Sequence, residues 1–381
     1  MPERSLLEDD GSYYWALIGD STSNLDVERE AGIEAKVFSL SWRLYEEADG
    51  VWNEEYIARK LSEFQQIRAA GLEVILSLGY HDPPNWIHEA YANSRYINQY
   101  GVPYVSLDPI DGGDVNLVWN QEMRFLVERY VAHVLANFGS DVVAVRVGGG
   151  RFGELTYPPA EYEGSENAYW AFDDNAWAQN PVPDWRPGEP ASGDEPARFL
   201  DWYLDALVEF QNWQIEMVRA DYAGPLMILY PSWGLRPGDI ELALATNLDG
   251  SSSPERNGEV QRGYDFARQV AALAEPNLIL TTTWLDADVY PDLELEDDPR
   301  FWSPVHYLAT LAAEQPLQPA LFGENTGQGS ERDMALSARR MEAHGLLGMA
   351  WYRERELFSG DYASLDSYRT IIAETEKSAA P

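Results

Sequence analysis

The feature that most constrains the fold of this chain is a repeated alternation of short apolar runs and longer helical patterns. The runs are rich in β-branched and aromatic residues, and the stretches between them place apolar residues at helical spacing. Eight such runs occur, at residues 14–19, 35–42, 73–79, 142–148, 225–230, 278–284, 319–323 and 346–352. Because strands that alternate with helices form parallel sheets, eight units predict an α/β fold, the (β/α)₈ or TIM barrel.

The helical patterns carry their own start and stop signals. Asn53 is predicted to cap a helix that has two glutamates in its first turn and ends before Gly71. Apolar stripes then mark the buried faces of three helices: Ile57, Leu61, Phe64 and Ile67; Met123, Leu126, Tyr130 and Val134; and Leu200, Leu204 and Leu207. These stripes indicate packing against a core.

Two stretches, 157–195 and 231–258, interrupt the regular rhythm and are rich in Pro, Gly and polar residues. Both follow the carboxyl ends of predicted strands, the fourth and the fifth, where barrel enzymes build their active sites. We therefore expect elaborated loops that form walls or lids of a cleft. A barrel domain can reach this length, so residues 1–381 are predicted to form a single catalytic domain.

The charge of the chain excludes several classes of partner. Its 64 acidic and 27 basic residues give a formal net charge of −37, which repels nucleic acid and anionic membranes and is typical of a solvated acidic surface, including one adapted to high salt.

No apolar run reaches the roughly 18 to 20 residues of a membrane span. The absence of cysteine removes thiolate chemistry and disulfides. The first residues do not read as a signal peptide, so we expect a cytoplasmic protein, or a secreted one whose signal is absent here.

Two glutamates stand where a barrel enzyme places its chemistry. Glu154 follows a glycine-rich exit from the fourth predicted strand, and Glu324 lies at the matching end of the seventh. Strands four and seven lie nearly opposite each other in an eight-stranded barrel, so the two carboxyl groups are expected to face one another. Hydrolysis of a glycosidic bond needs such a pair, one acid to protonate the leaving oxygen and one carboxylate to attack the sugar or activate water. Their separation distinguishes retention, at about 5 to 5.5 Å, from inversion, at about 6.5 to 9.5 Å.

The motifs around these glutamates resemble those of β-amylases. The segment Gly153-Glu154-Leu155-Thr156-Tyr157-Pro158 is similar to their fourth-strand motif, and Gly323-Glu324-Asn325 resembles their second motif. The run 348–353, which ends in Trp351-Tyr352-Arg353, resembles their last strand, and His81 before Pro84-Asn85-Trp86 resembles a segment with a sugar-binding histidine. The resemblance implies that Glu154 is the general acid, that Glu324 is the base acting on water, and that an arginine lies near Glu324.

The first third of the chain resembles a second group of barrels, the clan A glycosidases that include β-galactosidases. The similarity lies in Ala31-Gly32-Ile33, in Trp42-Arg43-Leu44-Tyr45-Glu46 and in the segment 70–76. This resemblance implies a retaining exo-glycosidase with Glu324 as nucleophile. Gly153 stands where that clan has Asn before its acid/base, which favours the β-amylase-like interpretation.

Residues at the strand ends are candidates for substrate contacts, because sugar rings stack on aromatic side chains and offer hydroxyls to charged and amide groups. The candidates are Trp42, His81, Asp82, Trp86, Arg151, Tyr157, Tyr230, Trp233, Trp284, Asp286, Asn325, Trp351 and Arg353. Trp170, Trp177 and Trp185 in the first long loop and Asp288 are further candidates. For each, packing or solvation is the alternative. Arg151 and Arg353 are also the candidates for a cation that tunes a catalytic carboxyl group.

Two other functions compete with hydrolysis. His81, Asp82, Glu154, Asp286 and Glu324 together offer metal-ligating groups, but no ligand spacing supports a metal site, so neither metal nor cofactor is expected. A carbohydrate-binding barrel without catalysis needs the aromatic residues but not both glutamates. The sequence thus predicts a glycoside hydrolase acting on an oligosaccharide or polysaccharide.

Overall fold

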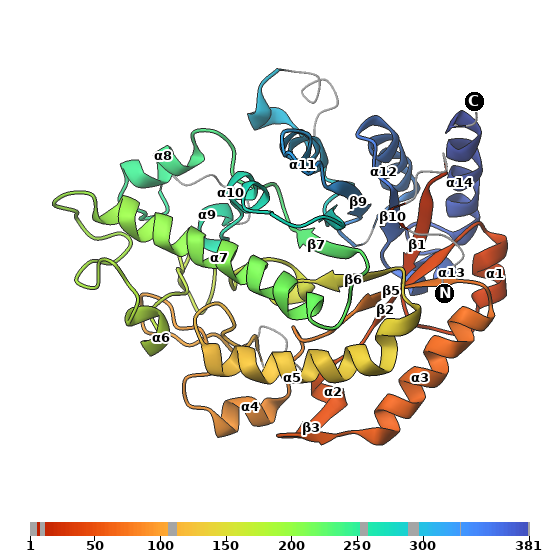
Figure 1. Ribbon diagram of the computed structural model, residues 1–381. Helices are drawn as coiled ribbons and strands as arrows, with labels where there is room; N and C mark the ends of the chain where they lie inside the picture. Colours follow the sequence, from red (N-terminus) through yellow and green to blue (C-terminus); the bar gives the residue numbers. More distant parts are fainter. Residues whose placement is uncertain are drawn as a thin grey trace.

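The computed structural model describes residues 6–7, 12–105, 113–251, 258–288, 297–327 and 329–379. Eight parallel strands form a closed barrel with helices packed around it (Figure 1). The barrel strands are β1 (Tyr14–Ile18), β2 (Ala35–Ser39), β5 (Glu73–Ser77), β6 (Ala144–Val147), β7 (Leu226–Tyr230), β8 (Leu278–Thr282), β9 (Ala320–Glu324) and β10 (Gly348–Trp351). Each overlaps one of the runs predicted from the sequence, so the predicted (β/α)₈ barrel is confirmed.

Helices and short elements fill the connections between the strands. The helices are α1 (Leu25–Glu30), α2 (Trp42–Tyr45), α3 (Glu54–Ala69), α4 (Asn85–Ala90), α5 (Gln121–Phe138), α6 (Asp174–Trp177), α7 (Glu195–Arg219), α8 (Asp239–Ala245), α9 (Glu259–Arg262), α10 (Phe266–Ala271), α11 (Pro304–Ala313), α12 (Glu331–Ala343), α13 (Glu354–Ser359) and α14 (Leu365–Ala379). Three 3₁₀ turns are η1 (Gly139–Asp141), η2 (Arg151–Gly153) and η3 (Pro299–Phe301). A small antiparallel hairpin joins β3 (Glu46–Ala48) and β4 (Val51–Trp52).

The local signals in the sequence match the observed helix ends. Asn53 caps α3, and its side chain accepts a hydrogen bond from the backbone nitrogen of Tyr56 at 2.9 Å. The stripe on α3 is buried at Ile57, Phe64 and Ile67. The stripes on α5 and α7 are buried as well, so these faces hold the helices against the barrel wall.

Alternation along each strand divides the core into two parts. One set of residues, including Ala144 of β6 and Phe322 of β9, packs inside the barrel. Their neighbours, such as Val145 and Val147, pack instead against the surrounding helices. Successive side chains of a strand point to opposite faces. Two positions further along β6 from Ala144, Arg146 therefore also points into the barrel.

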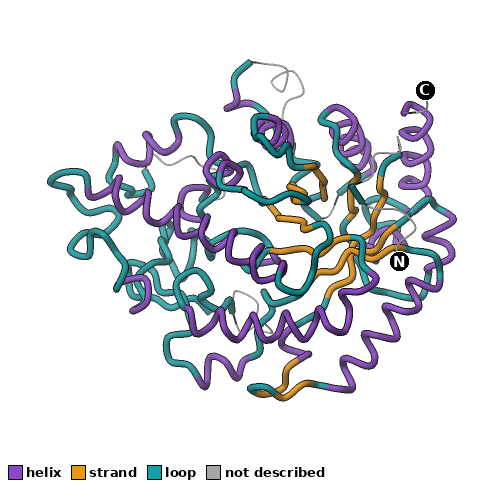
Figure 2. Tube along the Cα trace, viewed as in Figure 1, coloured by secondary structure: helices purple, strands orange, loops and turns teal. Residues whose placement is uncertain are grey.

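Long connections gather on one side of the barrel, beyond the carboxyl ends of the strands (Figure 2). The segments 157–194 and 231–258 follow β6 and β7, as predicted, although residues 252–257 lie outside the described part of the chain. A third long connection, residues 78–120 between β5 and α5, contains α4 and was not predicted as an interruption. None of the described helices is long and apolar enough to cross a membrane.

Candidate active site

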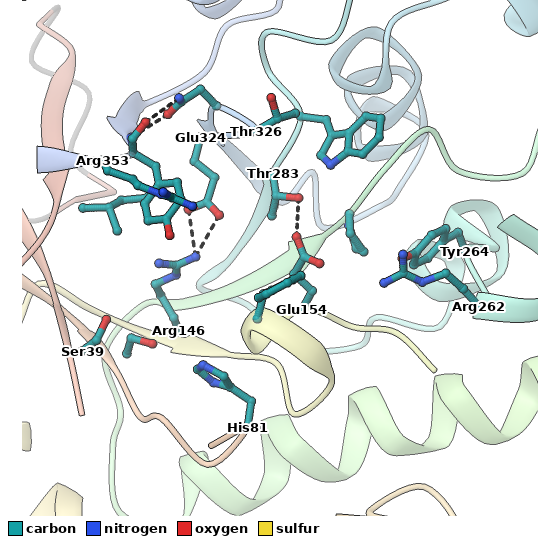
Figure 3. Close-up of a pocket in the computed structure, with 17 residues that line it drawn as sticks. Ser39, His81, Arg146, Glu154, Arg262, Tyr264, Thr283, Glu324, Thr326 and Arg353 are labelled. Carbon is teal, nitrogen blue, oxygen red and sulfur yellow. Dashed lines mark hydrogen bonds and ion pairs between the residues drawn. The ribbon is translucent and has the colours of Figure 1, made fainter. Parts of the chain in front are cut away.

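A cavity of about 550 Å³ lies at the carboxyl ends of the barrel strands. Its floor consists of inward-facing strand residues, and the loops supply its walls (Figure 3). The lining residues are Ile18, Ser39, Ser77, His81, Arg146, Phe152, Glu154, Pro231, Arg262, Tyr264, Thr283, Trp284, Glu324, Asn325, Thr326, Tyr352 and Arg353. Both glutamates predicted from the sequence are among them.

A tight glycine-rich turn delivers Glu154 to this cavity. After β6 the chain folds back on itself, and the nitrogen of Gly150 donates to the carbonyl oxygen of Glu154 at 3.0 Å. A Cβ atom on Gly148 would lie 1.9 Å from the carbonyl oxygen of Gly153, so no other residue fits at position 148 without movement of the backbone. Gly153 has φ of 76°, in the left-handed region that favours glycine. The turn explains the glycines that precede Glu154 in the sequence.

The surroundings of Glu154 favour its protonated form. Its carboxyl group accepts a hydrogen bond from the hydroxyl of Thr283 at 2.7 Å, and no ion pair holds it among the described residues. Burial raises the pKa of Glu154 to about 7, against the opposing effects of the Thr283 hydrogen bond and of the Arg262 charge. A carboxyl group with such a pKa keeps a proton to donate near neutral pH.

Glu324 has a different environment. It is the last residue of β9, and its side chain is 12% exposed. One guanidinium nitrogen of Arg146 contacts both of its carboxylate oxygens, at 2.8 and 3.1 Å. Burial raises the pKa of Glu324, and the adjacent Arg146 charge opposes that rise. The ion pair thus stabilises the carboxylate form of Glu324.

Arg146 is the cation paired with Glu324, whereas the sequence interpretation had named Arg151 or Arg353 as the cation that tunes a catalytic carboxyl group. Arg151 instead donates to the hydroxyl of Tyr104 at 2.8 Å and does not line the cavity. Arg353 does line it, but it pairs with Glu356, at 3.5 Å. The signal for Arg146 was present in the sequence, because a charge two residues after Ala144 on an apolar strand must point into the barrel.

His81 lines the cavity beside the turn that carries Glu154. Burial lowers the pKa of His81 to about 4. The imidazole is therefore neutral at pH 7 and is able to both donate and accept a hydrogen bond. Such a side chain is able to bond a hydroxyl group of a ligand in the cavity.

Four of the predicted contact residues line the cavity, namely His81, Trp284, Asn325 and Arg353. Asn325 also holds the following strand end, since its amide nitrogen donates to the carbonyl oxygen of Tyr352 at 2.6 Å. The lining further includes side chains that the sequence interpretation missed: Ser39, Ser77, Arg146, Phe152, Arg262, Tyr264 and Thr283. Ser39 and Ser77 end β2 and β5, so alternation along those strands would have found them.

Four predicted aromatic contacts do not line the cavity but fill the protein interior. Trp42, Tyr157, Tyr230 and Trp351 are each at most 2% exposed. Trp42 stacks on a tyrosine of α5 at 5.3 Å, and the hydroxyl of Tyr230 donates to Gln211 at 2.8 Å. Trp351 and Tyr230 belong to the outward-facing set of their strands, which packs against the helices. For these four residues the packing alternative describes the structure.

The other predicted contacts lie outside the cavity lining and have partners of their own. Asp82 pairs with Arg43 at 2.9 Å, and the indole nitrogen of Trp86 donates to the carbonyl oxygen of Glu46 at 3.1 Å. Asp286 accepts a hydrogen bond from the backbone nitrogen of Thr326 at 2.8 Å, and Asp288 lies 3.8 Å from Arg332. Trp233 packs edge-on against Trp284 at 6.3 Å, just behind the wall of the cavity.

The tryptophans of the first long loop are mainly structural. Trp170 and Trp185 are buried, and their indole nitrogens donate to backbone carbonyl oxygens within the same loop. Trp177 is 38% exposed and does not line the cavity. Within the described ranges, no three His, Asp or Glu side chains come together as ligands for a metal ion.

The fold and this cavity define the class of structure to which the chain is similar, a (β/α)₈ barrel with a glutamate pair at its carboxyl face. Comparison with solved structures finds the same barrel in glycoside hydrolases. The chain superposes on the catalytic domain of a β-amylase from Paenibacillus polymyxa with a TM-score of 0.70 and 14% identity, over 97% of this chain and 99% of that one.

Two β-galactosidases show the same likeness over a part of their length. They are those of the psychrophilic Marinomonas ef1, with a TM-score of 0.58 and 13% identity, and of the haloarchaeon Halorubrum lacusprofundi, with 0.56 and 14%. Each match covers 96% of this chain but only 59% and 58% of theirs. At these identities the similarity is one of fold. No protein-family model and no curated protein sequence matches the chain.

Proposed function

We propose that this protein is a glycoside hydrolase in which Glu154 is the general acid and Glu324 the catalytic carboxylate. The observation that carries the proposal is the contrast between the two groups within one cavity. Glu154 has a hydroxyl partner and a raised pKa of about 7, whereas Glu324 is paired with Arg146. Burial raises the pKa of both groups, but only Glu324 has a guanidinium partner that stabilises its charged form, which suits the acid and the carboxylate of glycosidic hydrolysis.

The proposed reaction uses one water molecule for each bond. The proton of Glu154 passes to the glycosidic oxygen while the bond from the anomeric carbon to that oxygen breaks. Water adds its hydroxyl group to the anomeric carbon, and its remaining proton passes to Glu324. Exchange of protons with solvent then restores a protonated Glu154 and an ionised Glu324.

We favour Glu324 as a base acting on water, because its motif resembles that of β-amylases. In the alternative, taken from the resemblance to clan A, Glu324 attacks the anomeric carbon and forms a covalent intermediate. NMR of the first product formed distinguishes the two routes: an inverted anomer supports the base, and a retained anomer supports the nucleophile.

The substrate we propose is an oligosaccharide or polysaccharide. The support comes from the cavity lining, which combines aromatic rings at Tyr264 and Trp284 with hydroxyl groups at Ser39 and Ser77. Aromatic faces suit the C–H groups of a sugar ring, and the polar groups suit its hydroxyls. A screen of chromogenic glycosides and glucans identifies the bond that is cleaved.

Substitution of each glutamate tests the assignment. The Glu154→Gln variant is expected to lose roughly 10²- to 10⁴-fold of its rate on sugar–sugar bonds. It should lose much less on aryl glycosides with acidic phenol leaving groups, which depart without a proton. The Glu324→Gln variant should lose activity on both kinds of substrate.

The matched control is Glu216→Gln, which changes an exposed glutamate of α7. This control should keep full activity, and circular dichroism should show that all three variants are folded. Full turnover by folded Glu154→Gln and Glu324→Gln would overturn the assignment. Specific binding of glycans by the parent without turnover of any would instead support a carbohydrate-binding barrel. Retained activity after exhaustive chelation separates the proposal from metal-dependent hydrolysis.

A further inference from the structure

The cavity has the opposite charge balance to the rest of the protein. The chain carries a formal net charge of −37, yet the cavity lining contains three arginines and only two carboxyl groups. The arginines are Arg146, Arg262 and Arg353, and the carboxyl groups are Glu154 and Glu324. Most basic side chains of so acidic a protein have acidic partners available within the chain. A local excess of arginines in the cavity therefore points to an anion that belongs to a ligand.

Two of the three arginines have carboxylate partners. Arg146 is paired with Glu324 at 2.8 Å. Arg353 is 42% exposed and lies 3.5 Å from Glu356, although its Nε is buried and has no hydrogen-bond partner among the described residues. Both arginines therefore have a carboxylate within ion-pair distance.

Arg262 is the exception. It is 8% exposed, and its Nε donates to the hydroxyl of Thr156 at 3.2 Å. Its guanidinium lies 5.1 Å from the centre of the Tyr264 ring. Among the described residues no carboxylate forms an ion pair with Arg262, and no acceptor binds its two terminal nitrogens. Figure 3 shows the guanidinium on the Glu154 side of the cavity.

The guanidinium of Arg262 has lost most of its hydration without gaining a carboxylate partner, while its two terminal nitrogens stay accessible from the cavity. Glu154 lines the same cavity as Arg262 and feels its charge, but a general acid must hold its proton when the reaction begins. The charge of Arg262 in fact opposes that, since it lowers the pKa of Glu154. A separate anion beside Arg262 would compensate the guanidinium and weaken its lowering effect on the pKa of Glu154.

The position of Arg262 identifies the part of the substrate that would carry this anion. Thr156, which holds the Nε of Arg262, lies two residues after Glu154 in the chain. Because a general acid protonates the oxygen of the leaving group, the leaving sugar lies on the Glu154 side of the scissile bond. A substituent of the leaving sugar is therefore within the part of the cavity that Arg262 lines.

We propose that the leaving-group side of the cavity binds a sugar with an anionic substituent, a carboxylate or a sulfate ester, through the terminal nitrogens of Arg262. This inference rests on the proposed function for the meaning of the leaving-group side, but the binding it describes does not require turnover. Guanidinium groups bind both anions through paired hydrogen bonds.

Binding of monosaccharides tests the proposal without any catalytic step. The probes are glucuronate, glucose 6-sulfate and glucose, each titrated by NMR or calorimetry into the parent, into Arg262→Gln and into Arg353→Gln. At least one anionic sugar should bind the parent roughly tenfold or more tightly than glucose, as a charge-assisted hydrogen bond implies. The preference should disappear in Arg262→Gln and persist in Arg353→Gln. Comparison of the two anionic probes distinguishes a carboxylate from a sulfate.

Three results would overturn the proposal: equal binding of glucose and both anionic sugars, a preference that survives in Arg262→Gln, or a preference lost only in Arg353→Gln. An Arg262→Lys variant keeps the charge and should keep a weaker preference, which separates loss of the cation from loss of the fold. If no glycoside is hydrolysed but Arg262 still selects anionic sugars, the proposed function fails and this inference stands. If glycosides are hydrolysed without any anion preference, only this inference fails.

Discussion

The raised pKa of Glu154 predicts that its replacement by glutamine stabilises the protein at alkaline pH. A carboxyl group whose pKa is higher in the folded than in the unfolded chain stabilises the fold at low pH, and this contribution is lost as the pH rises through the folded value. For Glu154 the pKa rises from 4.5 to about 7 on folding. Each unit is worth 1.36 kcal/mol, so ionisation of Glu154 in the folded protein costs about 3 kcal/mol as an upper limit, because the cavity also admits water.

Glutamine resembles the protonated carboxyl group in shape and still accepts the hydrogen bond from Thr283. At pH 5, just above the unfolded pKa of 4.5, the Glu154→Gln variant should therefore be more stable than the parent by less than about 1 kcal/mol. At pH 8.5 the variant should be more stable by up to about 3 kcal/mol. For a chain of 381 residues this corresponds to roughly 4 °C in the melting temperature.

The assay is thermal or urea unfolding of both proteins at half-unit steps between pH 5 and 8.5. Glu28 and Glu259 also have pKa values raised by burial to about 7, but both are present in the two proteins and cancel in the difference. The Glu216→Gln control should show no pH-dependent difference. A difference between parent and Glu154→Gln that stays constant across this range would refute the reasoning.

Three further predictions concern other parts of the structure. Arg146→Gln removes the cation beside Glu324 and so raises the pKa of Glu324 further. The acid limb of the pH–rate profile should therefore move to higher pH, and the rate at pH 5 should fall roughly tenfold or more. An acid limb that does not move would contradict the role of the ion pair. Phe152 lines the cavity, is 67% exposed and has φ of 62°. Its replacement by glycine should relieve backbone strain and raise the free energy of unfolding in urea by about 1 kcal/mol, while KM rises several-fold. An unchanged KM would exclude a contact between Phe152 and the sugar. Lys36 is fully buried and lies 2.9 Å from Glu28 and 3.1 Å from Glu354. Lys36→Met leaves both carboxylates without their cation and should lower the free energy of unfolding by about 3 to 5 kcal/mol. A loss below about 1 kcal/mol would contradict this.

The barrel was predictable because its signals are local. Runs of β-branched residues, the cap at Asn53 and the stripe on α3 each depend on a few neighbouring positions, and the structure agrees with them. The glutamates were found for a similar reason. The glycines before Glu154 and the glycine before Glu324 lie near strand ends, at positions where neighbouring atoms leave little or no room for a Cβ atom.

The remainder of the site depends on which face of a strand a residue occupies and on contacts between distant loops. Trp351 was selected because it ends a strand, yet alternation places Ala350 inside the barrel and Trp351 outside it. The same rule, applied to β6, would have selected Arg146. Arg262 lies in a short helix far from Glu154 in sequence, and no local pattern reveals that the two residues line the same cavity.

The two glutamates are attached to the barrel in different ways. Glu324 ends β9 itself, and Glu154 follows β6 by a turn that closes on its own backbone. The framework that sets the spacing between them is thus the closed sheet, whereas Arg262, Tyr264 and Trp284 come from the segments between successive barrel strands. Grafting or laboratory evolution of these connections should therefore change which glycan is accepted while the chemistry of bond cleavage is inherited unchanged.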